Sequence, residues 1–177
     1  KRLQRRADLV IGGSRHTCSE VEHLGMRRLH VLPNGIRIPD MSGLGPDRRR
    51  LREQFGIADS TILVGVVSRL HPGKGHRHLF EAIGRLRHRG LDVALLVVGD
   101  GDHRAALEDQ VLSLALSPAV RFAGRVESVA PYLAAMDVYC LPSLKESLSI
   151  AVLEAMAAGL PVVTTRVGDF ATLIDPG

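Results

Sequence analysis

The chain has 177 residues, 45% of them hydrophobic and 24% charged, which is typical of a globular protein with one full core. Its apolar runs are too short to span a membrane, no signal-peptide pattern opens it, and Cys18 and Cys140 match no metal-binding spacing, so we expect a cytoplasmic protein with reduced thiols and no metal. The net charge of +4 would suit a peripheral contact with the inner membrane face, but an aromatic content of 3% argues against a nucleic-acid partner.

Short β-branched runs alternate with segments of helical periodicity along the chain. Strands are predicted at residues 8–12, 29–32, 62–67, 93–98, 120–122, 138–141 and 162–165. Helices are predicted at residues 15–24, 47–55, 78–89, 104–116, 128–135 and 147–158. Two basic runs, 48–52 and 77–89, fall in these helices and are interpreted as solvated faces. The alternation predicts an α/β fold, with a Rossmann-like doubly wound parallel sheet and helices on both faces.

The stretch from residue 33 to residue 46 is rich in Pro and Gly and lacks periodicity, so it is interpreted as a linker between structural units. Doubly wound sheets bind ligands in the crevice beyond the carboxyl ends of their strands. The loops that directly follow the strands after this linker are therefore the candidate functional segments.

The first such loop, residues 67–75, carries Arg69 and Lys74, which would project into the crevice. Gly73 and Gly75 would let the backbone approach a ligand closely. The loop is not a P-loop, because the Gly-x4-Gly-Lys-Ser/Thr pattern is absent. Lysine is rare in this arginine-rich chain. Its presence at position 74 indicates that a compact ammonium group, rather than a guanidinium, is required there. A pair of solvated charges on a turn remains the alternative.

Two more turns follow strands. Gly99 and Gly101 lie in residues 98–104, which resemble the start of a dinucleotide fingerprint but lack its third glycine. This is weak evidence for a nicotinamide cofactor, and we interpret the segment as a tight strand-to-helix turn that lines the same crevice. The turn at residues 122–126 offers backbone groups to a flat base.

Glu146 and Glu154 are the most informative pair in the chain. Glu146 lies at the mouth of the helix predicted at residues 147–158, and Glu154 lies about two turns further along it. A separation of eight positions is roughly 80° past two full turns and about 12 Å of rise, so both carboxylates would lie on one broad face. Free N–H groups at the helix start would offer an anion site. A ligand with hydroxyls at both ends and phosphate in the middle, such as a nucleotide-sugar, suits this layout.

Taken in order, these segments resemble the C-terminal, donor-binding half of retaining glycosyltransferases of the GT-B fold, in the glycosyl transferases group 1 family (family 4). The similar segments are 7–11 with Ser14, 32–36, 67–75, 98–101, 122–124, and Pro142-Ser143 followed by Glu146-x7-Glu154-Ala-Met-Ala-x-Gly-x-Pro-Val. Each motif alone is weak, but their shared order and spacing are specific. The resemblance extends from Ala7 to the end of the chain.

The resemblance implies that Arg69 and Lys74 hold the donor diphosphate and stabilise its departure, while Glu146 contacts the sugar hydroxyls. The other donor-binding positions it implies are Glu154, Gly99, Gly101, Gly124, Arg125, Val126, Ser147, Leu148, Ser149 and Ile150. In this scheme Glu154 contacts the ribose, residues 147–150 meet the phosphates, and residues 124–126 face the base. The donor would be a UDP-, GDP- or ADP-sugar, the acceptor a glycan, a lipid or a similar molecule, and neither a cofactor nor a metal is expected.

The chain departs from the family pattern at two places. Leu148-Ser149 stands where the family usually has an aromatic residue and a glycine. The family's Gly-Gly-x-x-Glu is replaced by Gly168-Asp169-Phe-Ala-Thr172, which lacks the glutamate.

The resemblance also implies a domain organisation. Residues 1–32 would end an N-terminal acceptor domain, residues 33–46 would link the domains, and residues 47–177 would form a nucleotide-sugar-binding domain that is truncated at its C-terminus. The isolated chain is therefore expected to lack full activity. Two alternatives stay open, a nucleotide-sugar epimerase and a non-catalytic basic module that binds nucleic acid or a membrane surface.

Overall fold

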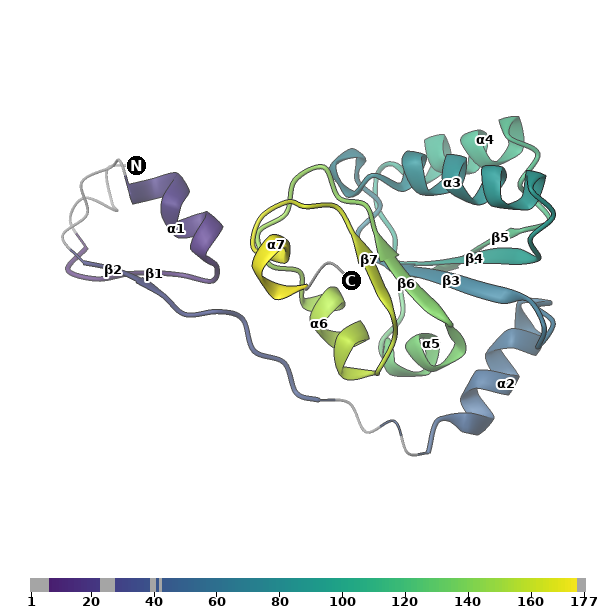
Figure 1. Ribbon diagram of the computed structural model, residues 1–177, viewed down its shortest axis with the longest axis horizontal. Coiled ribbons are helices and arrows are strands. Elements are labelled where there is room, and N and C mark those ends of the chain that lie inside the picture. Colours follow the sequence, from purple (N-terminus) through teal and green to yellow (C-terminus); the bar gives the residue numbers. More distant parts are fainter. Residues whose placement is uncertain (1–6, 23–27, 39–40, 42, 175–177) are drawn as a thin grey trace.

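A computed structural model describes residues 7–22, 28–38, 41 and 43–174. The chain forms a small N-terminal unit and a larger main unit, and residues 32–38 leave the small unit without forming a helix or strand (Figure 1). In the N-terminal unit, the strands β1 (Val10–Gly12) and β2 (Leu29–Val31) pair in parallel beside helix α1 (Arg15–Glu22).

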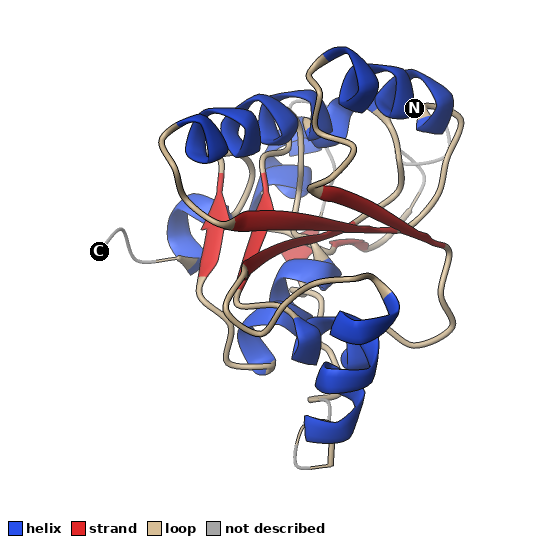
Figure 2. Ribbon diagram, turned by 90° about the vertical axis from the view of Figure 1, so that its right-hand side faces the viewer, coloured by secondary structure: helices blue, strands red, loops and turns tan. Residues whose placement is uncertain are grey.

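The main unit contains a five-stranded parallel sheet in the order β5-β4-β3-β6-β7. Its strands are β3 (Ile62–Val67), β4 (Val93–Val98), β5 (Val120–Gly124), β6 (Val138–Leu141) and β7 (Val162–Thr164). Two helices, α3 (His76–His88) and α4 (Arg104–Ser113), cover one face of the sheet (Figures 1 and 2). The other face carries α2 (Gly45–Gln54), α5 (Ala130–Ala135) and α6 (Ile150–Ala157).

The predicted α/β fold with a doubly wound parallel sheet is confirmed, and each predicted strand and helix is present within a few residues of its expected bounds. Residues 23–24 of the first predicted helix lie outside the described residues. Two elements were missed, the 3-10 helix η2 (Pro72–Lys74) and helix α7 (Phe170–Leu173), because each is too short to show periodicity. The linker also ends earlier than predicted, since α2 begins at Gly45 with a proline in its first turn, where no N–H donor is needed.

The core lies around β4, which is buried at every residue. Its uninterrupted apolar sequence is typical of a strand covered on both faces. Gly65 of β3 is needed because a Cβ at this position would overlap the Met136 side chain. From β3 the chain adds β4 and β5 on one side and then crosses to add β6 and β7 on the other. This reversal opens a crevice at the carboxyl ends of β3 and β6, where ligands of doubly wound folds bind.

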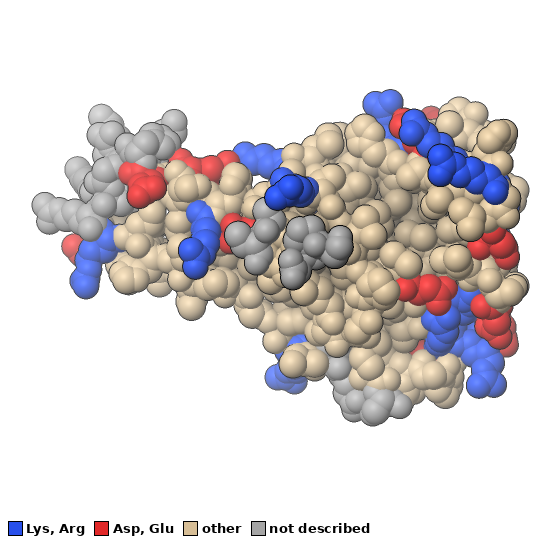
Figure 3. Space-filling model, viewed as in Figure 1, with Lys and Arg blue, Asp and Glu red and all other residues tan. Residues whose placement is uncertain are grey.

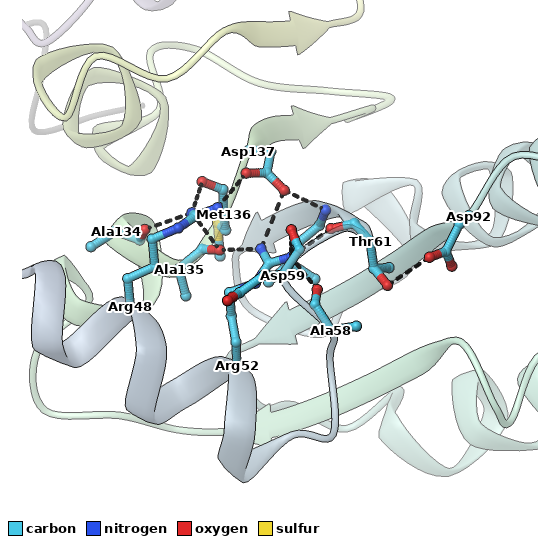
Figure 4. A network of polar contacts seen from close by, with 11 residues as sticks. Arg48, Arg52, Ala58, Asp59, Thr61, Asp92, Ala134, Ala135, Met136 and Asp137 are labelled. Atoms are coloured by element: carbon cyan, nitrogen blue, oxygen red, sulfur yellow. Dashed lines mark hydrogen bonds and ion pairs between the residues drawn. The ribbon is translucent and has the colours of Figure 1, made fainter.

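Arg52 corrects the interpretation of the basic run 48–52 as a solvated face. Its side chain is only 1% exposed and donates hydrogen bonds to the carbonyl oxygens of Ala58, Thr61 and Ala135 (Figure 4). Asp137 accepts hydrogen bonds from Arg52 and from the backbone N–H of Leu63. Although burial acts to raise it, the pKa of Asp137 is lowered, because these donors and Arg48 stabilise the carboxylate. This network ties α2 to the amino end of the sheet.

Candidate functional site

A cavity of about 650 Å³ lies at the carboxyl ends of the central strands. This volume is in the range of small-molecule and cofactor sites. The predicted site residues among its lining are Arg69, Gly99, Gly101, Arg125, Val126, Ile150 and Glu154. Four loops or helix starts that are distant in sequence therefore meet at the crevice that the topology predicts.

The loop after β3 is shaped by η2 and by Gly75. Gly75 has a φ of 72°, and a Cβ at this position would overlap the carbonyl oxygen of Pro142. The carbonyl oxygen of Gly73 accepts a hydrogen bond from the backbone N–H of Leu144 at 2.8 Å. Gly75 therefore serves the close packing of this loop against the segment that follows β6, in addition to any approach to a ligand.

Lys74 and Glu146 form an ion pair beside the cavity rather than in its lining. Lys74 Nζ lies 2.5 Å from Glu146 Oε2, and Ser143 Oγ donates to the same oxygen at 3.3 Å. The Lys74 and Glu146 side chains are 25% and 14% exposed, so the pair is partly shielded from water. The loop after β3 and the segment after β6 were predicted to lie at the same crevice. Their charged groups, Lys74 and Glu146, are in direct contact.

Arg69 takes a different position from Lys74. Its side chain is 66% exposed and lies in the lining of the cavity, with its Nη2 atom 3.2 Å from Asp102 Oδ2. Asp102 was not among the predicted site residues, although its place beside Gly101 in a strand-end turn could have indicated it. Arg69 and Lys74 thus approach the crevice from separate places and have separate acidic partners.

Gly99 and Gly101 lie in the turn after β4 and line the cavity. A Cβ on Gly99 would overlap the carbonyl oxygen of Ser68, and one on Gly101 would overlap that of Leu70. These glycines let the turn after β4 lie directly on the segment after β3. Gly124 has a φ of 73° and accepts a hydrogen bond from the N–H of Gly99, but only its neighbours Arg125 and Val126 line the cavity.

Glu146 and Glu154 do not share a helical face, so the prediction from their spacing was wrong. Helix α6 begins at Ile150, and Ser149 has extended angles of φ −81° and ψ 122°. Glu146 and Ser147 therefore lie in a loop before the helix, because this segment packs against other loops rather than coiling on itself. Only Glu154 is helical. It lines the cavity, and burial raises the pKa of its carboxyl.

The residues expected to meet phosphate are divided between two places. Ile150, at the first turn of α6, lines the cavity, where N–H groups of the helix start have no acceptor within the helix. Ser147 instead contacts the N-terminal unit, because Thr17 Oγ1 donates to Ser147 Oγ at 3.0 Å, and Leu148 contacts the segment after β2, because Asn34 Nδ2 donates to the Leu148 carbonyl at 3.5 Å. Ser149 is buried.

Besides Asp102, two further functional candidates, Ser68 and His76, were not predicted from the sequence. Ser68 lines the cavity, and its hydroxyl lies 2.9 Å from Nε2 of His76, a residue that is 2% exposed. Burial, followed by the nearby His103 and Lys74, lowers the pKa of His76 to about 4. His76 is therefore neutral near pH 7. Within the described residues, no group of three or more His, Cys, Asp or Glu side chains is arranged to hold a metal ion.

The comparisons with known proteins agree on one kind of protein. Residues 61–177 match the model of the family described as glycosyl transferases group 1. The 2-deoxystreptamine glucosyltransferase of Streptomyces kanamyceticus is 34% identical over 146 residues, which cover 80% of this chain and 38% of that enzyme. The GDP-mannose-dependent alpha-(1-6)-phosphatidylinositol monomannoside mannosyltransferase of Mycolicibacterium smegmatis is 34% identical over 182 residues, which cover 95% of this chain and 47% of that enzyme.

A solved structure extends the likeness to the fold. The HepE protein of Anabaena, crystallised in complex with UDP and glucose, superposes with a TM-score of 0.88 at 30% identity. The superposition covers 99% of this chain and 49% of that protein. The chain thus spans about half the length of these proteins or less.

Proposed function

The chain belongs to the glycosyl transferases group 1 family and has the Rossmann-like fold of the C-terminal half of a GT-B glycosyltransferase; on this basis we propose that it binds the donor of a retaining sugar transfer. The donor is a nucleoside-diphosphate sugar, and the acceptor is a glycan, a lipid or a similar molecule. The supporting observation is the cavity at the carboxyl ends of the strands, which contains both Arg69 and Glu154 and adjoins the Lys74–Glu146 pair.

In the proposed donor pose, residues 124–126 face the base and Glu154 accepts hydrogen bonds from the ribose hydroxyls. Arg69, Lys74 and the N–H groups at the start of α6 contact the diphosphate, and Glu146 contacts the sugar. The raised pKa of Glu154 reflects burial, and ribose hydroxyls would return to its carboxylate some of the hydrogen bonds lost with water.

The proposed reaction breaks the bond between the anomeric carbon and the donor phosphate. The diphosphate leaves with the electron pair, and the acceptor hydroxyl forms the new bond on the same face of the sugar while it passes its proton to an oxygen of the leaving diphosphate. Negative charge develops on the leaving diphosphate. Arg69, Lys74 and the helix N–H groups would already contact the diphosphate in the bound donor, so they would stabilise the charge that develops on it, and no metal is expected.

The alternatives have less support. The relatives named above are sugar transferases, and no observation favours an epimerase. A basic module for nucleic acid or membrane would need a continuous positive surface. On the face seen in Figure 3, however, Lys and Arg side chains lie beside Asp and Glu side chains, with broad uncharged areas between them. Within the described part of the chain, every helix is too short or too polar to cross a membrane.

The base and the sugar are open within this proposal, because one similar protein is crystallised with UDP and another uses GDP-mannose. Isothermal titration of the chain with UDP, GDP and ADP and with their sugar conjugates tests it. We expect the compounds of one of the three nucleotides to bind with a dissociation constant below about 1 mM, as for typical substrate affinities. Absence of binding by all of these compounds would show that the proposal is wrong.

A further inference from the structure

The turn after β7 carries Asp169, one of the two places where the chain departs from the family pattern. Its carboxylate reaches the N-terminal unit. Asp169 Oδ2 accepts a hydrogen bond from the backbone N–H of Arg15 at 2.8 Å, and Oδ1 accepts one from the N–H of His16 at 2.9 Å. These are the first two residues of α1, whose N–H groups have no acceptor within their own helix. Asp169 therefore caps, across 154 positions of sequence, a helix of the other unit.

The same turn is fixed to the loop that carries Glu146. The backbone N–H of Asp169 donates to the carbonyl oxygen of Ser147 at 2.9 Å. Gly168 has a φ of 57°, and a Cβ at this position would overlap the carbonyl oxygens of Glu146 and Ser147. The turn therefore touches the Glu146 loop backbone to backbone, with no side chain between them to absorb a displacement.

Further contacts connect the N-terminal unit with this loop. Thr17, in the first turn of α1, donates its hydroxyl to Ser147 Oγ. Lys145 Nζ lies 3.0 Å from Glu20 Oε1 on the same helix. On its other side, the loop is held by Lys74 through Glu146. Glu146 thus lies between the basic loop after β3 and a set of contacts that depend on α1.

The nucleotide cavity does not share these contacts. The residues that line it come from the segment between Val67 and Glu154, and α1 and the Gly168–Asp169 turn are not among them. A shift of the N-terminal unit relative to the main unit would therefore move Glu146 and change its contact with the sugar of a donor. The positions of the base, the ribose and Arg69 would stay the same.

We propose that Asp169 is a positioning residue that couples the seating of the N-terminal unit to sugar recognition, by capping α1 and holding the Glu146 loop through the same turn. A glycine, as in the usual family pattern, has no carboxylate with which to make the cap. The inference rests on the proposed function for the identity of the ligand, but the cap itself is independent of any ligand.

The test uses the whole chain as Asp169→Asn and Asp169→Ala variants, with Asp109→Asn on α4 as a matched control at an exposed aspartate. Hydrogen exchange is measured at the amides of Arg15 and His16, with Leu95–Val97 as a check that the core is folded. Asp169→Ala should exchange at least about threefold faster at both α1 amides, the loss expected when a helix cap is removed, whereas Asp169→Asn keeps one acceptor oxygen and should lose protection at only one of them. Asp109→Asn should exchange as the unchanged chain does.

Dissociation constants are then measured for UDP and UDP-glucose and for GDP and GDP-mannose, and the pair that binds is used. The Asp169 variants should bind the free nucleotide as before but the sugar conjugate roughly fivefold or more weakly, a coupling of ordinary size. Thr17→Val should shift the same ratio in the same direction without altering Asp169. General destabilisation would weaken both compounds equally.

The outcomes separate the two proposals. Unchanged exchange at Arg15 and His16, or an unchanged ratio of the two dissociation constants, would overturn the role of Asp169 while leaving the donor-binding function standing. Binding of neither nucleotide nor conjugate by the unaltered chain would instead reject the proposed function, whatever the exchange rates are.

Discussion

Lys74 Nζ lies 2.5 Å from Glu146 Oε2, so the charged ends of two loops that are 72 positions apart in sequence meet beside the cavity. In the donor-free chain, each group thereby has a partner. A diphosphate that enters must take part of the ammonium's hydrogen bonding, and the carboxylate is then available to sugar hydroxyls. The pair connects the phosphate-binding and sugar-binding parts of the proposed site.

Lys74→Ala is expected to weaken the binding of a nucleoside diphosphate by about 1–3 kcal/mol, because a charge-assisted hydrogen bond to phosphate is lost. The corresponding nucleoside, which lacks phosphate, should bind as before. Titration calorimetry with both compounds measures the difference. Lys145→Ala removes an exposed lysine next to Glu146 and serves as the control for general electrostatics. An equal loss for nucleoside and diphosphate would mean that the loop has a structural role only.

Glu146→Ala and Glu154→Ala should each weaken the binding of the sugar nucleotide by about 1–3 kcal/mol, because each removes hydrogen bonds to a charged group. Glu154→Ala should also weaken the nucleotide without sugar, since its proposed partner is the ribose. The same titrations at increasing salt separate this from a basic binding module, whose affinity falls steeply with salt. A module of that kind would be indifferent to losing either carboxylate or would bind more tightly.

His76 is expected to make folding stability depend on pH. Burial lowers its pKa from 6.5 to about 4. Between these pH values His76 is protonated in the unfolded chain but remains neutral in the folded chain. The stabilisation is fully present above pH 6.5 and is lost as pH falls toward 4, to a total of about 3 kcal/mol.

Urea unfolding of the chain at several pH values measures this loss. His76→Gln should flatten the dependence between pH 6.5 and 4.5, whereas His78→Gln, at an exposed position on the same helix, should leave it unchanged. A slope that survives in His76→Gln would assign the pH dependence to other groups.

Arg52→Met is expected to lower the free energy of unfolding by about 3 kcal/mol or more. The substitution keeps the length of the side chain but leaves the carbonyl oxygens of Ala58 and Thr61 without their guanidinium donor in the interior. Urea denaturation gives the change. Arg49→Ala, at an exposed position on α2, should cost less than about 0.5 kcal/mol. Similar values for the two variants would contradict the structural role of the network.

The isolated 177-residue chain is expected to bind donor but to transfer almost no sugar to an acceptor. It spans about half the length of the similar proteins, and orienting two bound reactants is worth about 7–11 kcal/mol of a reaction barrier. Chromatography of the products should show only slow hydrolysis of the donor by water. Efficient transfer to a glycan or lipid acceptor by this chain alone would contradict the expectation.

Local sequence was sufficient for the fold and for the location of the site. The apolar run of β4 and the alternation of strand and helix periods depend on burial along each element, so they are visible in a single chain. Parallel strands then bring the loops that hold Arg69, Gly99 and Glu154 to one edge of the sheet, as predicted. The family resemblance added the roles of these residues, which periodicity alone does not contain.

Contacts between distant loops were decided only by the tertiary structure. The start of α6 at Ile150, the burial of Arg52 and the cap that Asp169 provides to α1 each depend on partners far away in sequence. Helical periodicity predicted that the helix begins at residue 147, directly after Glu146, whereas hydrogen bonds to neighbouring loops hold residues 147–149 outside α6. A local pattern records which side of an element is buried, but the partner against which it is buried is set by the packing of the whole chain.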